Sequence, residues 1–418
     1  MSIRFTHFMY MLFFLTFCVT AKAQRTYTLR QTLQIARTNN SFLKAERYHL
    51  DLASTDITSA KLFNNPTFEF NYMNVTARRY AEPGTKLYSA LNNQYALQVS
   101  QSFQIAGQRR HTIATSEKEM ELAERNFDET QRDLLFKVAN AWLVVWSAEQ
   151  QLEIVHISKK NIDSLVRSHQ YLYRNQVITQ SDLHRAELLS KQYAIQYKTA
   201  LQERDNSLQD LQLLLGNPEE IRVDTAANFL FDISANLSAL IEQSLNSRSD
   251  LQAAHSAINV SNSHIRLQES LAYPQPTIGF FWNPQNAVPY WGLCVTIDLP
   301  IFNRNQGNIR KAQVLRQHAE QQLVILEDQL QNEITTAYAS YQTQRQNVAD
   351  FQVIVNQSEN ILNSVRSAYL EGNTTIIDFF EAQRSWLETQ QAYYDARQAY
   401  AESYIALLYT TGLINELA

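Results

Sequence analysis

The stretch 291–299 reads WGLCVTIDL, so large apolar residues alternate with small or polar ones. Successive side chains of a β-strand point to opposite faces, and this alternation is therefore typical of a strand with one apolar face. The preceding stretch 278–282 (IGFFW) places Ile278, Phe280 and Trp282 on one such face, and the link between the two stretches contains two prolines. We therefore predict a β-hairpin at about 276–300.

A second hairpin of the same kind is predicted at about 66–105. Its later strand begins YALQV at Tyr95, its earlier strand is TFEFNY at 67–72, and Pro83-Gly84 supplies a turn between them. The alternation slips near Met73, and we expect a β-bulge there.

Strands of this length with one apolar face suit a transmembrane β-barrel, and an amphipathic hairpin packed on helices is the alternative. Two hairpins supply four strands, which cannot close a barrel, and open sheet edges are not tolerated in lipid. If these strands span a membrane, several chains must therefore share one barrel.

The rest of the chain has the composition of long helices. No glycine or proline lies between Gly107 and Gly216, or between Gly307 and Gly372, and apolar residues recur at spacings of three and four. A helix of 64 residues would be about 95 Å long, too long for a compact domain. We expect a coiled coil or a barrel of helices.

Each half of the chain repeats this order of elements. A shift of 196 positions aligns Tyr173 with Tyr369, Asp182 with Asp378 and Gly216 with Gly412. We predict a first repeat at 24–218, with a helical turn at about 173–182. The second repeat, at 219–418, has its turn at about 369–378. Both helical turns then lie far from both β-hairpins, and function is expected at these two ends.

Composition excludes several classes of protein. The eight glycines are dispersed, so neither a phosphate-binding loop nor a nucleophile elbow can be built. The formal net charge of −5, without a basic run, argues against a nucleic-acid partner. Two distant cysteines and no closely spaced histidines give no metal site. We expect no catalytic residue and no cofactor.

The N-terminus has the features of an export signal. Arg4 precedes the apolar stretch 8–19, and Ala21-Lys22-Ala23 has the form of a cleavage site. We expect residues 1–23 to be a signal peptide. Lipidation of Cys18 is not expected, because the bulky Phe17 precedes it. The later sequence has no apolar run that could span a membrane as a helix.

The chain resembles the TolC-type outer-membrane efflux proteins, most closely their cobalt–zinc–cadmium resistance branch. The resemblance covers essentially all of 24–418 and is carried by these segments: YTL at 27–29, QSF at 101–103, GQRR at 107–110, RSDL at 248–251, LPIFNR at 299–304 with Gly307, and YLEGNTTIID at 369–378. It implies a mainly α-helical homotrimer. A shared 12-stranded β-barrel would lie in outer-membrane lipid, and a long α-helical barrel would extend into the periplasm.

Asp378 and Glu381 are three residues apart and share a helix face. In a three-fold assembly they would place six carboxylates at the narrow end, where an acidic ring favours cations. The resemblance implies that these two positions line a closed periplasmic aperture. Thr179-x-x-Asp182 and Thr375-x-x-Asp378 also have the form of helix capping boxes, and capping alone is the alternative interpretation.

The resemblance further implies a tip latch that includes Tyr369 and Asp182. The arginine that completes the latch in the family is replaced here by Thr374. The tips themselves are expected to face a periplasmic adaptor, through Gln176, Val177, Ile178, Thr179, Gly372, Asn373 and Thr375. Gly372 corresponds to Gln176 and Glu381 to Arg185, so we expect the two tips to differ.

The function implied is that of a passive duct in a tripartite efflux system, with a periplasmic adaptor (membrane fusion protein) and an inner-membrane pump as partners. The cargo could be heavy-metal cations, small hydrophobic compounds or a polypeptide. The alternative is a periplasmic coiled-coil scaffold or adaptor whose hairpins never enter lipid.

Overall fold

A computed structural model describes residues 26–216, 221–225, 233, 236–284 and 288–417 of the chain. The predicted signal peptide, with Cys18, lies outside these residues. The helices are α2 (Leu29–Asn39), α3 (Ser41–Ala60), α4 (Gln108–Arg174), α5 (Gln180–Leu215), α6 (Leu237–Ser247), α7 (Ser249–Ser270), α8 (Gln306–Leu370) and α9 (Ile376–Thr410). The strands are β1 (Thr26–Tyr27), β2 (Thr67–Asn74), β3 (Asn93–Ser102), β4 (Arg222–Val223), β5 (Thr277–Asn283) and β6 (Tyr290–Thr296). Short 3₁₀ helices lie at Arg78–Tyr80, Ala90–Asn92 and Leu413–Leu417.

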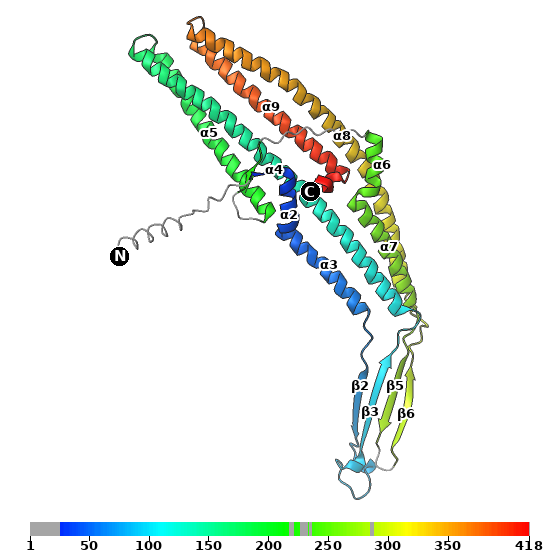
Figure 1. The fold of residues 1–418 in the computed structure, drawn as a ribbon. Helices are drawn as coiled ribbons and strands as arrows, with labels where there is room; N and C mark the ends of the chain where they lie inside the picture. The colour runs from blue at the N-terminus through cyan, green and yellow to red at the C-terminus, as the bar shows by residue number, and fades with distance from the viewer. Residues whose placement is uncertain (1–25, 217–220, 226–232, 234–235, 285–287, 418) are drawn as a thin grey trace, which may run out of the picture.

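The molecule is elongated, with helical turns at one end and a small sheet at the other (Figure 1). Helices α4 and α5 form one long antiparallel hairpin, and α8 and α9 form a second hairpin beside it. Helix α4 has 67 residues and α8 has 65, which corresponds to about 100 Å each. None of the helices within the described ranges is long and apolar enough to cross a membrane.

The two repeats use similar signals to begin and end their helices. A residue with a left-handed backbone precedes each long helix, Gly107 before α4 and Asn305 before α8. Helix α5 ends at Gly216, whose φ is +60°, and a Cβ atom there would lie 2.8 Å from the backbone oxygen of Asn39. Only glycine fits at this helix end, because both the dihedral angle and the close approach exclude a side chain.

The four longer strands form one antiparallel sheet in the order β2-β3-β5-β6. Both repeats therefore contribute two adjacent strands, at the end opposite the helical turns (Figure 1). The predicted bulge at Met73 is wrong, since Met73 pairs with Gln94 and Asn74 with Asn93 in unbroken register. The break in alternation arises because Met73 is an apolar residue on the otherwise polar face.

The register gathers the large apolar side chains on one face of the sheet. Phe68 is opposite Val99, Val99 is opposite Phe280, and Phe280 is opposite Leu293. This face is uncovered: Phe68 is 66% exposed and Leu293 is 72% exposed. We call it the apolar sheet face, comprising Phe68, Phe70, Tyr72, Tyr95, Leu97, Val99, Ile278, Phe280, Trp282, Trp291, Leu293 and Val295.

Polar and small residues occupy the opposite face of the sheet, including Glu69, Gln98, Ser100 and Thr277. Met73, Phe281 and Tyr290 are the large exceptions, and the ring of Phe281 lies over Gly292, where a Cβ atom would approach to 2.6 Å. The mainly helical fold with two internal repeats and two-faced strand pairs is therefore confirmed.

The largest core lies midway along the molecule. Trp142 and Trp146 of α4 are fully buried there, against residues of α2, β4 and the C-terminal part of α9. The parallel pair β1–β4 closes this region, and the indole of Trp142 donates to the backbone oxygen of Tyr27 at 3.2 Å. This core fixes the base from which both helical hairpins extend.

A buried ionic network borders the central core. Arg132 of α4 is 2% exposed; it makes two hydrogen bonds to Glu129 and donates to the backbone oxygen of Tyr409 at 2.6 Å. Arg248, at the start of α7, is 3% exposed and binds Asp250 and Glu333. Asp250 also lies 3.7 Å from Arg132, so one carboxylate serves both arginines. The network joins α4, α7, α8 and the end of α9.

The charges of this network sustain one another. Burial alone would favour the neutral form of Asp250, but its hydrogen bonds with Arg248 and the charges of Arg248 and Arg132 hold its pKa below the ordinary value. A carboxyl group whose pKa is lowered on folding stabilises the fold above its unfolded pKa of about 3.9, and this stabilisation is lost as the pH falls through the folded value.

We predict that Asp250→Ala lowers the free energy of unfolding by about 1.5–3 kcal/mol at pH 7, because the charge-assisted bonds of the shared carboxylate are lost while Glu129 and Glu333 still pair the two guanidinium groups. The difference from wild type should shrink as the pH falls below about 4. Thermal and denaturant unfolding in mild detergent, followed by helical circular dichroism, measures both effects. Asp51→Ala, on an exposed position of α3, is the matched control, and equal losses in the two variants would contradict the prediction.

Candidate functional site

The turns that end the two helical hairpins share one backbone conformation. In the α4–α5 turn, the amides of Gln176 and Val177 bond the carbonyls of Tyr173 and Leu172. In the α8–α9 turn, the amides of Gly372 and Asn373 bond their counterparts at Tyr369 and Ala368 in the same way. This pair of backbone hydrogen bonds defines the Schellman motif, which requires a residue with a left-handed backbone conformation.

The left-handed residue is Gln176 in one turn, with φ +57°, and Gly372 in the other, with φ +76°. The expected difference between the tips is therefore one of side chains and not of backbone. A side chain at positive φ is strained by about 1 kcal/mol, and Gln176 carries this strain.

A capping box starts the second helix of each hairpin, as the sequence predicts. The hydroxyl group of Thr179 accepts from the amide of Asp182, and that of Thr375 accepts from the amide of Asp378. In turn, the carboxylates of Asp182 and Asp378 accept hydrogen bonds from the amides of Thr179 and Thr375. Asp182 and Asp378 therefore act as caps in this chain, whatever else they do.

The carboxylate of Asp378 remains exposed at the tip. It accepts hydrogen bonds from the hydroxyl groups of Thr375 at 2.6 Å and Thr374 at 2.8 Å. These bonds, with that from the Thr375 amide, lower the pKa of Asp378, so its charge is held at neutral pH. Thr374, which we predict to stand in place of a latch arginine, is thus hydrogen-bonded to Asp378.

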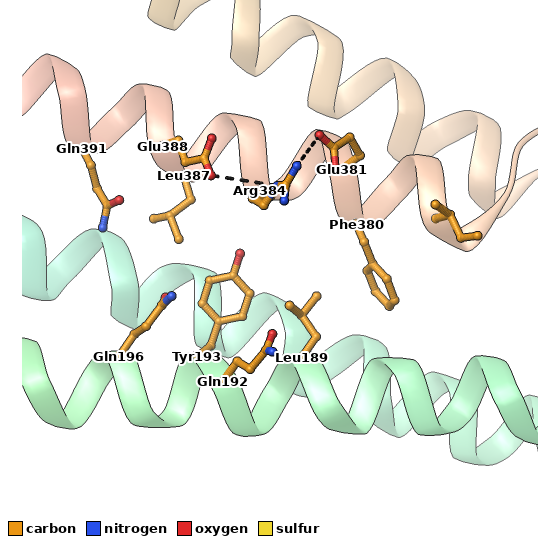
Figure 2. Close-up of a pocket in the computed structure, with 11 residues that line it drawn as sticks. Leu189, Gln192, Tyr193, Gln196, Phe380, Glu381, Arg384, Leu387, Glu388 and Gln391 are labelled. Carbon is orange, nitrogen blue, oxygen red and sulfur yellow. Dashed lines mark hydrogen bonds and ion pairs between the residues drawn. The ribbon is translucent and has the colours of Figure 1, made fainter.

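Glu381 lies one turn further along α9 and is paired. Its carboxylate accepts from Arg384 at 2.7 Å, and Arg384 also lies 3.9 Å from Glu388 (Figure 2). The three side chains line a groove of about 420 Å³ between α5 and α9, across from Tyr193. Burial raises the pKa of Tyr193 to about 12, so its phenol is neutral there. Asp378 is thus the aperture candidate without a cationic partner among the described residues.

Tyr369, the predicted latch tyrosine, bonds a residue that the sequence did not single out. Its hydroxyl group lies 2.7 Å from Nε2 of His169, and the two rings stack with centroids 6.0 Å apart. The pKa of Tyr369 is raised mainly by burial and, to a smaller extent, by the negative charge of the nearby Asp182. The structure thus brings Tyr369 and Asp182 into one neighbourhood and places Thr374 with Asp378.

His169 links the two hairpins at the tip, because it lies on α4 and Tyr369 lies on α8. It is 1% exposed, and its Nδ1 donates to the backbone oxygen of Leu165 at 3.0 Å. Nε2 is then the acceptor of the neutral ring, and the Tyr369 hydroxyl donates to it. Burial lowers the pKa of His169. The hydrogen bond to the Leu165 backbone and the charge of Asp182 act in the opposite direction but do not outweigh burial.

His169 gives a faint signal in the sequence. It continues the apolar spacing of Ile162 and Val166 along α4, so a histidine stands where a core residue is expected. A search for pairs of metal-ligating histidines does not detect this pattern.

The predicted adaptor-facing residues are mostly at the surface. Gln176, Thr179, Gly372, Asn373 and Thr375 are exposed, Val177 is 66% exposed, and Ile178 is half-buried. The neighbouring isoleucines differ, since Ile376 packs inward and Ile377 is 56% exposed. In the part of the chain that the structure describes, no three His, Cys, Asp or Glu side chains gather into a potential metal site.

The sequence matches the family model described as outer membrane efflux protein over residues 32–217 and 240–413. Among curated proteins, it is 22% identical to the cobalt-zinc-cadmium resistance protein CzcC of Cupriavidus metallidurans, over 88% of this chain and 85% of CzcC. It is also 26% identical to the cation efflux system protein CusC of Escherichia coli K12, over 43% of this chain and 42% of CusC.

Solved structures with the same fold include two bacterial channels. The CmeC outer membrane channel of Campylobacter jejuni superposes with a TM-score of 0.78 at 16% identity, over 92% of this chain and 85% of CmeC. The open state of the MtrE outer membrane channel of Neisseria gonorrhoeae gives a TM-score of 0.74 at 17% identity, over 92% of this chain and 89% of MtrE.

The His169–Tyr369 pair generates a prediction about pH. An exposed histidine takes up a proton near pH 6.5, whereas the buried ring resists it. The tip should therefore become less stable as the pH drops below about 6.5. The equilibrium constant for local opening should rise by at most about tenfold for each pH unit. Hydrogen exchange of residues 162–174 and 362–370 between pH 7.4 and 5.5, corrected for intrinsic rates, measures this effect.

His169→Gln should remove the pH dependence, because a glutamine oxygen can accept from Tyr369 and does not titrate. His184→Gln, at an exposed position on α5, should leave it as in wild type. The same pH dependence in His169→Gln would show that another group is responsible.

Proposed function

The chain belongs to the outer membrane efflux protein family, and on that premise we propose that it is the passive outer-membrane duct of a tripartite efflux system. Three copies would form the duct, with the sheet in the outer membrane and the helical hairpins in the periplasm. A periplasmic adaptor and an inner-membrane pump would engage the helical tips.

The apolar sheet face is the observation that carries this proposal. The sheet exposes Phe68, Phe280, Trp291 and Leu293 on one face. In water this exposure is unfavourable by about 25 cal/mol for each Å² of apolar surface that could be buried. In lipid the same face is favourable, but the unpaired edges β2 and β6 are not. The sheet therefore needs both lipid and a partner edge.

A second copy of the chain provides that edge with the correct direction. Each neighbouring pair in the order β2-β3-β5-β6 is antiparallel, so β2 and β6 run in opposite directions. β6 of one copy can consequently pair antiparallel with β2 of the next. Three copies supply twelve strands, an even number as in bacterial outer-membrane barrels. The polar face, with Glu69, Gln98 and Thr277, would line the lumen.

The rival function is a periplasmic scaffold whose sheet stays out of lipid. The extent of the apolar sheet face argues against it, because contiguous exposed apolar surface of this kind marks an interface with lipid or protein. No described segment of the same chain covers this face.

We further propose heavy-metal cations as cargo. The names of CzcC and CusC associate those proteins with cobalt, zinc and cadmium resistance and with cation efflux. In this chain, Asp378 keeps its charge at the tip without a cationic partner among the described residues. A ring of such carboxylates would favour cations without binding them tightly.

The first test is fractionation of the expressed protein, followed by sizing in mild detergent. We expect recovery from the outer membrane as a trimer. Phe280→Arg with Leu293→Arg should abolish membrane recovery, because each arginine on a lipid-facing strand costs roughly 2–4 kcal/mol near the membrane centre. Gln98→Arg with Ser100→Arg, on the opposite face, is the control. A soluble monomer in wild type would favour the scaffold.

The aperture residues give a second test. Asp378→Asn with Glu381→Gln removes two carboxylates per chain, and cation over anion selectivity in planar bilayers should fall toward unity. Asp51→Asn with Asp56→Asn removes two exposed carboxylates from α3 and should leave selectivity unchanged. Equal selectivity in wild type and the aperture variant would exclude these residues from the pore constriction.

A further inference from the structure

A second groove near the tips lies between α4 and α8, with α9 as its floor. Its volume is about 250 Å³, and Ser164, Ser168, Arg366 and Gln383 are among its lining residues. Ser164 and Ser168 are one turn apart on α4, so both hydroxyl groups lie on the same helix face. None of the lining residues is acidic.

Gln383 is the buried polar residue of this groove. It is 2% exposed, and its amide nitrogen has no hydrogen-bond partner among the described residues. A buried amide without a partner destabilises a fold by about 1–3 kcal/mol, and an acceptor that reached this amide would remove the cost. A leucine of similar size would avoid this cost.

Arg366 is the charged residue of the groove. It lies exposed on α8 and forms no ion pair with the described part of the chain. By contrast, Arg384 on the other side of α9 is held by Glu381. The groove therefore presents a guanidinium group, an amide and two hydroxyl groups, which together complement an acceptor with negative charge.

The groove opens away from the predicted aperture. Residues of an α-helix are about 100° apart around its axis, so Gln383 lies about 160° from Glu381 and about 140° from Asp378. If Asp378 and Glu381 face the lumen, the groove faces the outside of the duct. Its occupant would then be a periplasmic protein and not the cargo.

We propose that this groove receives an aspartate or glutamate side chain of the periplasmic adaptor, bound by Arg366 and Gln383. The inference rests on the proposed function and names the chemistry of the contact. The guanidinium fork pairs with a carboxylate in two parallel hydrogen bonds, and the amide of Gln383 turns to donate a third. Ser164 and Ser168 leave room for the adaptor backbone, because their side chains are small.

The test uses the full chain as a detergent-solubilised assembly and the purified adaptor of its own efflux system. We expect Arg366→Glu to raise the adaptor dissociation constant by about tenfold or more, with a smaller rise for Arg366→Lys. Arg167→Glu is the matched control, because Arg167 is an exposed arginine on α4 outside the groove. An aspartate- or glutamate-to-arginine variant of the adaptor should restore binding to Arg366→Glu.

Gln383→Leu separates binding from folding. It should raise the melting temperature of the free assembly, since a buried unpaired amide is removed, and it should weaken adaptor binding at the same time. A purely structural glutamine would not weaken binding when replaced by leucine.

The remaining outcomes distinguish the inference from the proposed function. If wild type and both groove variants bind the adaptor equally, the groove assignment is wrong and the duct remains. If the variants dissociate into monomers, the groove is a contact between copies, which also overturns the inference. If wild type does not bind the adaptor at all, the tripartite proposal fails and the inference fails with it.

Discussion

The shared carboxylate of Asp250 is the interaction on which the geometry of the tips depends. It holds Arg132 and Arg248 in one buried network, at the level where four helices meet. From Arg132 to the end of α4 is about 60 Å of helix, so a tilt of about 5° at the network would move the tip by about 5 Å. Contacts such as Tyr369 to His169 tolerate far less than that. Precise packing at the tips therefore requires rigid charge pairing far from them.

The two repeats show how one backbone can carry two chemistries. Both turns use a Schellman motif followed by a capping box, although Gln176 stands where the other turn has Gly372. The side chains then diverge: the α9 tip bears Glu381, whereas α5 has Arg185 at the matching position. Both hairpins therefore carry one capping aspartate, Asp182 or Asp378, and the difference between the halves adds a second acidic residue, Glu381, to only one hairpin of each chain.

Much of the fold follows from local sequence patterns. The alternation around Phe280 and the long segments without glycine or proline are local patterns. The structure forms the strands and the long helices that these patterns predict. The pairing of His169 with Tyr369 was not predictable, because it joins residues 200 positions apart on different hairpins. The bulge expected at Met73 failed for a related reason: strand register is fixed by partners across the sheet and not by one strand alone.

In the candidate site, too, contacts between residues close in the sequence could be predicted, and contacts that depend on the three-dimensional surroundings could not. Capping by Thr375 and Asp378 could be predicted, because the residues are three apart. The ion pair of Glu381 with Arg384 has the same spacing and was available to the same reasoning. The uncompensated amide of Gln383 could not be predicted, because an unmet hydrogen bond is a property of its surroundings in three dimensions.

The strand order has a consequence for how the chain folds. Strand β3 belongs to the first repeat and β5 to the second, and their pairing joins Ser102 to Thr277. During synthesis the first hairpin must therefore wait, with one long edge open, until more than half of the chain has been made. Such non-local pairing folds slowly, and open apolar edges aggregate. Until β5 has been made, the first hairpin keeps an apolar face and an unpaired β3 edge exposed, and during this interval the unfinished chain is prone to aggregate.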